Sequence, residues 1–379
     1  MIQTSIHSSV MRSPFILTPH SKNAGFSLVE ILVSLAVLAI LLLINVQVID
    51  QVQSTWAASN ARVSQFREAR TAFDILVRNL SQATLNTFVD YDSNYVITAA
   101  QNAGVTMQTP SSYLRKSNLQ FVCGPSTSLL SGGGGEALLP GHAVFFQAPL
   151  GVSENPSYVG LDRLLCSRGY FVQFTSDEPF KPEFILSSGN KYRYRLMEFS
   201  PPTEKNLVYS SMGANGVATS SWFSAAAAQA NAINVGNETA LNIGVTRPIA
   251  DNILALIISP RQDTQANQTV SATVIAPRYA YDSTVVTLNT ANSPQGTQNL
   301  LPPLVKIVLV AVDERSAERL AEQNGSSPPF GTTLTTSFNN ANQLESTEIP
   351  NLIKYLASQN VNYRLFSATV QIRSSKGGL

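Results

Sequence analysis

The sequence predicts an α+β protein in which a long N-terminal helix packs on an antiparallel β-sheet with large loop insertions. Two observations lead to this fold class. No proline or glycine interrupts the chain from Phe26 to Leu85, and its apolar residues favour a helix. After Thr87, segments of alternating apolar and polar residues are separated by turn residues, a pattern typical of antiparallel strands with one wet face.

The first half of the predicted helix, residues 26–50, is apolar enough to cross a membrane. Between Ile31 and Ile44 the one polar residue is Ser34, and no charge lies between Glu30 and Asp50. About twenty such residues span the hydrocarbon core of a bilayer as a helix. Glu30 is the exception, because a carboxylate in an apolar helix is costly without a partner and is usually functional.

An ordinary signal anchor and a cleaved secretory signal are the alternatives for this segment. A secretory leader has its apolar core before the cleavage site, whereas here the apolar core follows Gly25. Residues 1–25 contain Arg12 and Lys22 and no acidic residue, which predicts a cytoplasmic leader under the positive-inside rule. Met11 is an alternative start of the chain.

Residues 51–86 predict an amphipathic continuation of the helix. A helix of roughly 60 residues is about 90 Å long, and we expect its second half to pack on a sheet. A coiled coil is the alternative, but the apolar spacing is too irregular for strict heptads. The apolar positions at three- to four-residue spacing are Val52, Trp56, Val63, Phe66, Ala69, Phe73, Leu76, Val77 and Leu80.

Residues 87–379 predict an extracytoplasmic domain rich in antiparallel strands with polar insertions. We expect short helices at 161–166, 224–232 and 352–358, and a charged helix at 314–323 that ends at Asn324-Gly325. Residues 326–347 are interpreted as a polar insertion. The expected strands are 142–150, 169–174, 192–199, 252–259, 304–313 and 363–372.

The composition argues against a nucleic-acid-binding protein. Charged residues make up 13% of the chain and the formal net charge is +1, so no strong field attracts a polyanion. We therefore expect no nucleic-acid partner.

Two interpretations stay open for the cysteines, Cys123 and Cys166. Outside the cytoplasm they can form a disulfide, which closes a loop of 43 residues and contributes about 3–4 kcal/mol in the entropic model. Two free, buried thiols are the alternative. We favour the bridge.

The residues that carry catalysis or bind metals are sparse, and we expect no enzyme, no metal and no cofactor. His142 is the one histidine beyond the leader and the membrane segment, and it begins an apolar strand, which favours a structural role. The acidic stretch 89–94 lacks the glycine and glutamate of a calcium loop and is interpreted as a turn. Residues 131–135 are glycine-rich, but no Lys-Ser/Thr follows as in a phosphate loop.

Gly25-Phe26-Ser27-Leu28-Val29-Glu30 resembles the class III signal of type IV prepilins and type II secretion pseudopilins. The resemblance implies that a prepilin peptidase cuts between Gly25 and Phe26 and that Phe26 becomes N-methylated. It implies that Glu30 pairs with the N-terminal ammonium of a neighbouring subunit in the membrane or filament core. It also implies a bacterial inner-membrane protein that crosses once, with its N-terminus in the cytoplasm and its C-terminal domain in the periplasm or on an extracellular filament.

A narrower resemblance extends over most of the chain. Residues 141–151, 194–199, 301–305 and 363–367 look like the Verru_Chthon cassette protein C family, whose members are large prepilin-like proteins. The layout is also similar to that of large minor pilins of the W type and of the J-type pseudopilin. These resemblances imply a pilin-like fold.

The function that the sequence favours is that of a minor pilin or pseudopilin that primes or caps a filament. Its expected partners are other pilins or pseudopilins through the N-terminal helix, the prepilin peptidase and the membrane. The alternative is a membrane-anchored binding protein or adhesin that uses the helix as its mount. An exposed aromatic or apolar patch far from the helix is the feature that would favour the adhesin.

Overall fold

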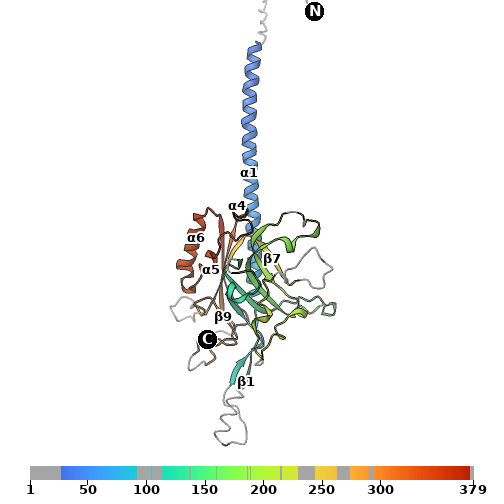
Figure 1. Cartoon of the computed structure of the whole chain (residues 1–379), viewed down its shortest axis with the longest axis vertical. Helices are drawn as coiled ribbons and strands as arrows, with labels where there is room; N and C mark the ends of the chain where they lie inside the picture. The colour runs from blue at the N-terminus through green and yellow to red at the C-terminus, as the bar shows by residue number, and fades with distance from the viewer. Residues whose placement is uncertain are drawn as a thin grey trace, which may run out of the picture. The chain divides into compact units, whose positions relative to one another are not determined.

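The computed structural model describes residues 27–91, 104, 113–135, 138–158, 160–185, 187, 189–213, 216–228, 244–262, 274–289 and 294–375 (Figure 1). The chain forms two compact units, Met1–Ala57 and Ala58–Leu379. Gly25, Phe26 and the rest of the leader lie outside the described residues, and so do residues 92–94 of the acidic stretch.

The long helix predicted by the sequence is α1, Leu28–Leu80. Ser27 immediately precedes it, and its carbonyl oxygen accepts hydrogen bonds from the N–H groups of Glu30 and Ile31. The helix ends at Leu80, six residues before the predicted end at residue 86. The reason is that the Thr84 N–H bonds to the carbonyl of Gln147 in a β-strand, so the backbone has left the helix there.

The described residues of the second unit form three sheets, and each strand pair among them is antiparallel, as predicted. A six-stranded sheet has the order β7-β6-β5-β4-β3-β9, a three-stranded sheet the order β11-β10-β8, and β1 pairs with β2. The strands are β1 Phe88–Tyr91, β2 Tyr113–Lys116, β3 Val122–Pro125, β4 His142–Pro149, β5 Leu165–Ser176, β6 Tyr192–Phe199, β7 Thr246–Asp251, β8 Ile253–Arg261, β9 Tyr281–Asp282, β10 Leu304–Val312 and β11 Tyr363–Gln371.

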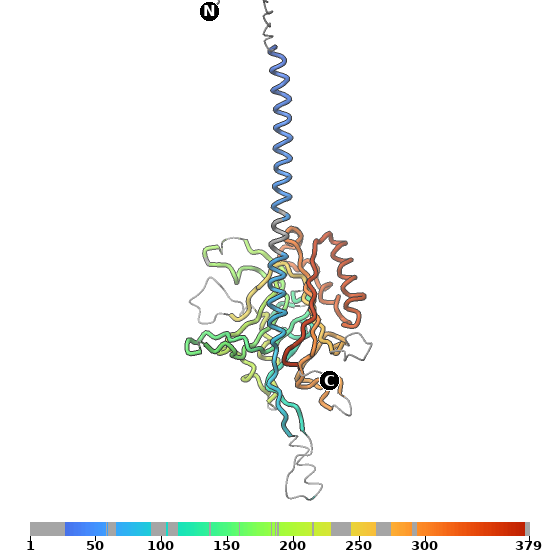
Figure 2. The backbone as a smooth tube through the Cα atoms, turned by 180° about the vertical axis from the view of Figure 1, so that it is seen from behind, coloured from blue at the N-terminus to red at the C-terminus, as the bar shows by residue number. Residues whose placement is uncertain are grey.

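The main core is formed by one face of α1 and residues from the six-stranded and three-stranded sheets. In Figure 2 the C-terminal part of α1 runs beside β11, and the Phe73 and Phe366 rings lie 6.0 Å apart. The three- to four-residue spacing predicted this buried face, because such positions lie on one side of a helix. Its fully buried members are Ala69, Ala72, Phe73, Leu76 and Leu80.

A second, smaller core covers the opposite face of the six-stranded sheet. Phe145 on β4 lies at its centre, stacked on Phe223 at 4.7 Å and edge-on to Trp222 at 6.1 Å. Of the predicted helix 224–232, residues 224–227 form turns, and residues 229–232 lie outside the described residues. Aromatic side chains of this size bury enough apolar surface to hold an irregular segment on a sheet.

The strand β6 differs from the predicted strand with one wet face. All of its residues after Tyr192 are buried, including Arg193 and Arg195. Each guanidinium has an acidic partner: Arg193 pairs with Glu314, and Arg195 Nε lies 3.0 Å from the Asp251 carboxylate. An acidic partner allows an arginine to be buried, so the alternating arginines of β6 did not mark a solvent-exposed face.

Residues 326–347 are not a polar insertion, as the sequence suggested, but part of the main core. They contain α5, Thr333–Thr336, and five buried apolar side chains, Phe330, Leu334, Phe338, Ala341 and Leu344. Residues 161–166 are likewise not a helix: Leu161 to Leu164 form a turn and β5 begins at Leu165. In the 326–347 segment, the polar residues between the buried apolar side chains concealed the apolar spacing.

The charged helix is confirmed as α4, Glu314–Asn324. The Asp313 carboxylate caps it by accepting from the Ser316 N–H at 3.1 Å, and it ends at Gly325 with φ 58°. The predicted helix at 352–358 is the longer α6, Ile349–Ser358. A short helix, α3 Ser126–Leu129, follows β3.

The cysteines form no bridge in the structure, in contrast to the interpretation that we favoured. Both are free, buried thiols. Cys123 on β3 pairs with Val144, and Cys166 on β5 pairs with Ala148, on opposite sides of β4. Two strand spacings are about 9–10 Å, and a disulfide needs Cα atoms within about 7 Å. The alternative of two free thiols therefore fits this fold.

His142 lies in the core, as the structural interpretation expected. Its ring is 4.4 Å from the Tyr279 ring, and its Nδ1 accepts a hydrogen bond of 3.1 Å from the Ile258 N–H on β8. Burial lowers the pKa of His142 to about 3, so the imidazole is neutral in the folded protein.

We predict that Leu76→Ala lowers the free energy of unfolding by about 3 kcal/mol, because the side chain is fully buried and leaves a cavity. Ile75→Ala is the matched control, since Ile75 is 40% exposed on the same helix, and it should cost less than about 1 kcal/mol. Denaturant unfolding of the full chain in detergent measures both values. Equal losses would show that this face of α1 is not the buried one.

We also predict a pH-dependent contribution from His142. In the unfolded chain its pKa returns to about 6.5, so the unfolded state binds more protons between pH 6.5 and about 3. Stability contributed by the neutral imidazole is complete above this window and is lost as the pH falls through it. The stability difference between the wild type and His142→Gln should shrink by about 2 kcal/mol from pH 7 to pH 5. A pH-independent difference would contradict burial of the neutral ring.

Candidate functional site

The candidate site is the N-terminal part of α1, Leu28–Ala57. This stretch of 30 residues has a mean hydropathy of 2.7 and no buried residue within its most apolar window. Its leucine, isoleucine and valine side chains are all exposed, on every side of the helix. A helix that is apolar all round requires an apolar environment, which lipid or neighbouring helices provide.

Four polar side chains in this stretch, Ser34, Asn45, Ser54 and Thr55, donate to carbonyls of their own helix. Ser34 Oγ donates to the Ile31 carbonyl at 2.9 Å, and Asn45 Nδ2 donates to the Leu41 carbonyl at 2.8 Å. Such bonds lower the cost of placing a polar group in lipid. A side chain can make such a bond only if it has a hydrogen-bond donor, because the backbone groups available to it within the helix are carbonyl acceptors.

Glu30 differs from Ser34 and Asn45 because an ionised carboxylate only accepts hydrogen bonds and cannot bond to the carbonyl oxygens of its own helix. It lies in the first helical turn, exposed, where the helix dipole favours a negative charge. Its own N–H donates to the Ser27 carbonyl at 3.0 Å. No ion pair to its carboxylate is present within the described part of the chain.

A buried polar network holds α1 on the six-stranded sheet, and sequence reasoning missed it. Asn79 Nδ2 donates to the Tyr170 hydroxyl at 2.7 Å, and this hydroxyl donates to Glu198 at 2.9 Å. Arg247 lies 2.9 Å and Arg168 3.9 Å from the same carboxylate. Burial raises the pKa of Tyr170, so the hydroxyl keeps its proton. The network is a structural clamp, since each group has a protein partner.

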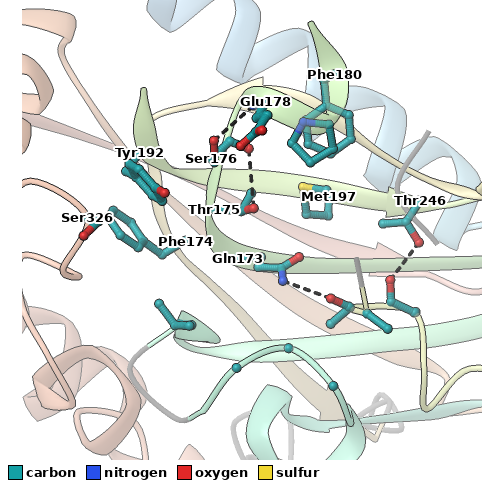
Figure 3. Close-up of a pocket in the computed structure, with 18 residues that line it drawn as sticks. Gln173, Phe174, Thr175, Ser176, Glu178, Phe180, Tyr192, Met197, Thr246 and Ser326 are labelled. Carbon is teal, nitrogen blue, oxygen red and sulfur yellow. Dashed lines mark hydrogen bonds between the residues drawn. The ribbon is translucent and has the colours of Figure 1, made fainter. Parts of the chain in front are cut away.

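A pocket of about 380 Å³ lies between the glycine-rich loop and the ends of β5 and β6 (Figure 3). Figure 3 shows Gln173 directed toward the 226–228 segment, and its amide donates to the Ala227 carbonyl at 3.0 Å. The Thr246 hydroxyl donates to the Ala226 carbonyl at 2.8 Å. These polar groups already bond to the protein, so the pocket presents no evident catalytic pair.

An exposed apolar patch lies on the β1–β2 pair and a neighbouring turn. Tyr91 and Tyr113 are opposite each other in the register, 48% and 65% exposed. Arg115 on β2 joins this pair to the turn by donating to the Gly296 carbonyl at 2.7 Å. On this pair the patch consists of Val89, Tyr91 and Tyr113, which share one face, whereas Phe88 lies on the other face. Val285, Val286 and Leu288 are exposed in the turn.

No group of three or more histidine, cysteine, aspartate or glutamate side chains that could hold a metal occurs among the described residues.

Comparison with known proteins identifies the N-terminal segment. The family model described as the prokaryotic N-terminal methylation motif matches residues 20–44. No curated protein matches the chain, and no solved structure matches it. The matched segment includes Gly25, Phe26 and Glu30 and the apolar start of α1. The chain thus carries an N-terminal segment similar to that of type IV pilin-like proteins, which are processed and methylated there, and this segment leads into a helix long and apolar enough to cross a membrane.

Proposed function

We propose that the chain is a minor pilin or pseudopilin that primes or caps a type IV pilus or a type II secretion-like filament. The observation that carries this proposal is an unburied apolar helix, preceded by the methylation motif, with one carboxylate in its first turn. A prepilin peptidase removes residues 1–25 and methylates the new N-terminus, Phe26. Residues 26–50 then anchor the subunit, with residues 51–86 as the helical continuation and 87–379 on the extracytoplasmic side.

The Glu30 carboxylate supplies the assembly step. In lipid or in a filament core it needs a positive partner, because an unpaired buried charge costs several kcal/mol. Cleavage creates an ammonium group at Phe26 on each subunit. A neighbouring subunit can therefore offer its ammonium to Glu30, and this pairing favours subunits in axial register.

The size of the second unit supports a low-copy position in the filament. This unit, Ala58–Leu379, includes the C-terminal part of α1. Its described residues form three sheets joined by long connections. In the body of a filament, each subunit is surrounded by neighbours that limit the size of its globular unit. A subunit at the tip has one side without neighbours, where a large unit fits. The resemblance to the Verru_Chthon cassette protein C family and to large minor pilins fits such a position.

The alternative proposal is an anchored binding protein or adhesin, and the exposed patch on β1 and β2 supports it. Contiguous exposed apolar side chains on a soluble surface are typical of interaction sites. Figure 1 shows β1 at the end of the second unit that is remote from α4 and α6. A tip subunit with a binding patch would satisfy both proposals.

We predict that Glu30→Gln leaves cleavage intact but abolishes incorporation into filaments, because the ammonium of the neighbour loses its counter-charge. Asp50→Asn removes the next carboxylate of α1 and is the matched control, which should assemble like the wild type. Sheared filament fractions, probed for the subunit by immunoblot, measure incorporation. Normal assembly of Glu30→Gln would contradict the proposed pairing.

For the alternative, we predict that Tyr91→Ser with Tyr113→Ser reduces surface or cell adhesion by at least about tenfold without lowering filament number. The two substitutions remove the largest apolar side chains of the patch. Tyr209→Ser, which is 52% exposed elsewhere, controls for loss of any surface tyrosine. Unchanged adhesion would remove the reason for assigning a binding role to this patch.

A further inference from the structure

The outer edge of β11 presents free backbone groups in a regular row. In an antiparallel pair, residues alternate between those that bond to the partner strand and those that point away. The Ile372 N–H donates to the Pro303 carbonyl, just before β10, so the even-numbered residues of β11 face β10. The N–H and C=O groups of Leu365, Ser367, Thr369 and Gln371 therefore point outward.

These outward groups have no protein partner in the described ranges of the chain. Ser367, Thr369 and Gln371 are exposed, and β11 contains neither proline nor glycine over its nine residues. A straight edge of this kind readily pairs with another strand, and proteins normally protect it.

The other long edges are protected. β8 is buried and its Ile258 N–H is bonded to His142. β7 carries Pro248 and an irregular register opposite Leu196 and Met197. β9 has two residues, and β1 and β2 have four each. β11 is thus the longest open edge among the described strands.

The flank of α1 beside this edge is basic. Phe66 and Phe73 face β11, since the Arg364 guanidinium lies 5.8 Å from the Phe66 ring and Phe73 contacts Phe366. At 100° per residue, positions 67, 70, 74 and 78 lie on the exposed side next to these two rings. Five exposed arginines and one carboxylate border the edge: Arg67, Arg70, Arg78, Arg364, Arg373 and Asp74.

We propose that the outer edge of β11 and this basic flank form a docking site for an extended, acidic segment of a partner protein. The segment adds a strand to the β11-β10-β8 sheet through the outward backbone groups, and its carboxylates face the arginines. The unpaired edge specifies an extended backbone, and the charge of the flank specifies acidic side chains. The site lies in the second unit and does not depend on processing at Gly25 or on the role of Glu30.

The test uses the full chain in detergent and a capped peptide of about eight residues that alternates threonine and glutamate. A matched peptide with lysine at each glutamate position is the control. The acidic peptide should bind, as measured by fluorescence anisotropy, and should weaken as salt rises. Residue-resolved hydrogen exchange should show new protection at Ser367, Thr369 and Gln371 and no change at the even-numbered residues that already bond to β10.

Two pairs of variants separate strand addition from simple charge attraction. Thr369→Pro removes an outward N–H and should raise the Kd by about tenfold or more, whereas Thr369→Val keeps the N–H and should bind like the wild type. Arg70→Glu with Arg78→Glu should also weaken binding, whereas Lys354→Glu on α6 should not. The proposal is overturned if the acidic peptide does not bind, if it binds without protecting the outward amides, or if the lysine peptide binds equally well.

Discussion

The burial of one face of α1 between two antiparallel sheets is the interaction on which the second unit depends. Leu76 and Leu80 have no exposed surface, and residues of nine strands and of the 330–356 region pack in the same core. α1 shares the core of the two sheets, and its Phe73 ring lies 6.0 Å from the Phe366 ring on β11. The Asn79–Tyr170–Glu198 network adds directionality to this apolar contact, since hydrogen bonds fix one rotation of the helix.

The same helix has a different physical character before Ala57. There its side chains are apolar on all sides and exposed, so the stabilising environment has to come from outside the chain. Ser34 and Asn45 satisfy their donors on their own helix, whereas the Glu30 carboxylate does not. This contrast explains why a single acidic residue in the first turn is compatible with anchoring and also suited to pairing between subunits.

Much of the fold could be predicted because its elements are locally encoded. The strands β4, β8, β10 and β11 are continuous apolar or alternating segments, and α4 has a cap and a glycine at its end. The helix of the candidate site and Glu30 were apparent for the same reason. Such features depend on neighbours in sequence and not on long-range packing.

The parts that were not predicted depend on contacts between distant residues. Arg193 and Arg195 are buried because Glu314 and Asp251 come from other elements. Phe330, Leu334, Phe338 and Leu344 enter the core although most of the residues between them are polar. The cysteines lie on strands that β4 separates, and sequence spacing alone cannot reveal such a separation. The open edge of β11 likewise becomes visible after its register with β10 is known.

The most direct test of the central claim is the intact mass and N-terminal sequence of the protein recovered from membranes of cells with a prepilin peptidase. Our account predicts a chain that begins at Phe26 and is heavier than its sequence by one methyl group. A chain that retains Gly25, or one that is cut after the apolar stretch, would contradict it.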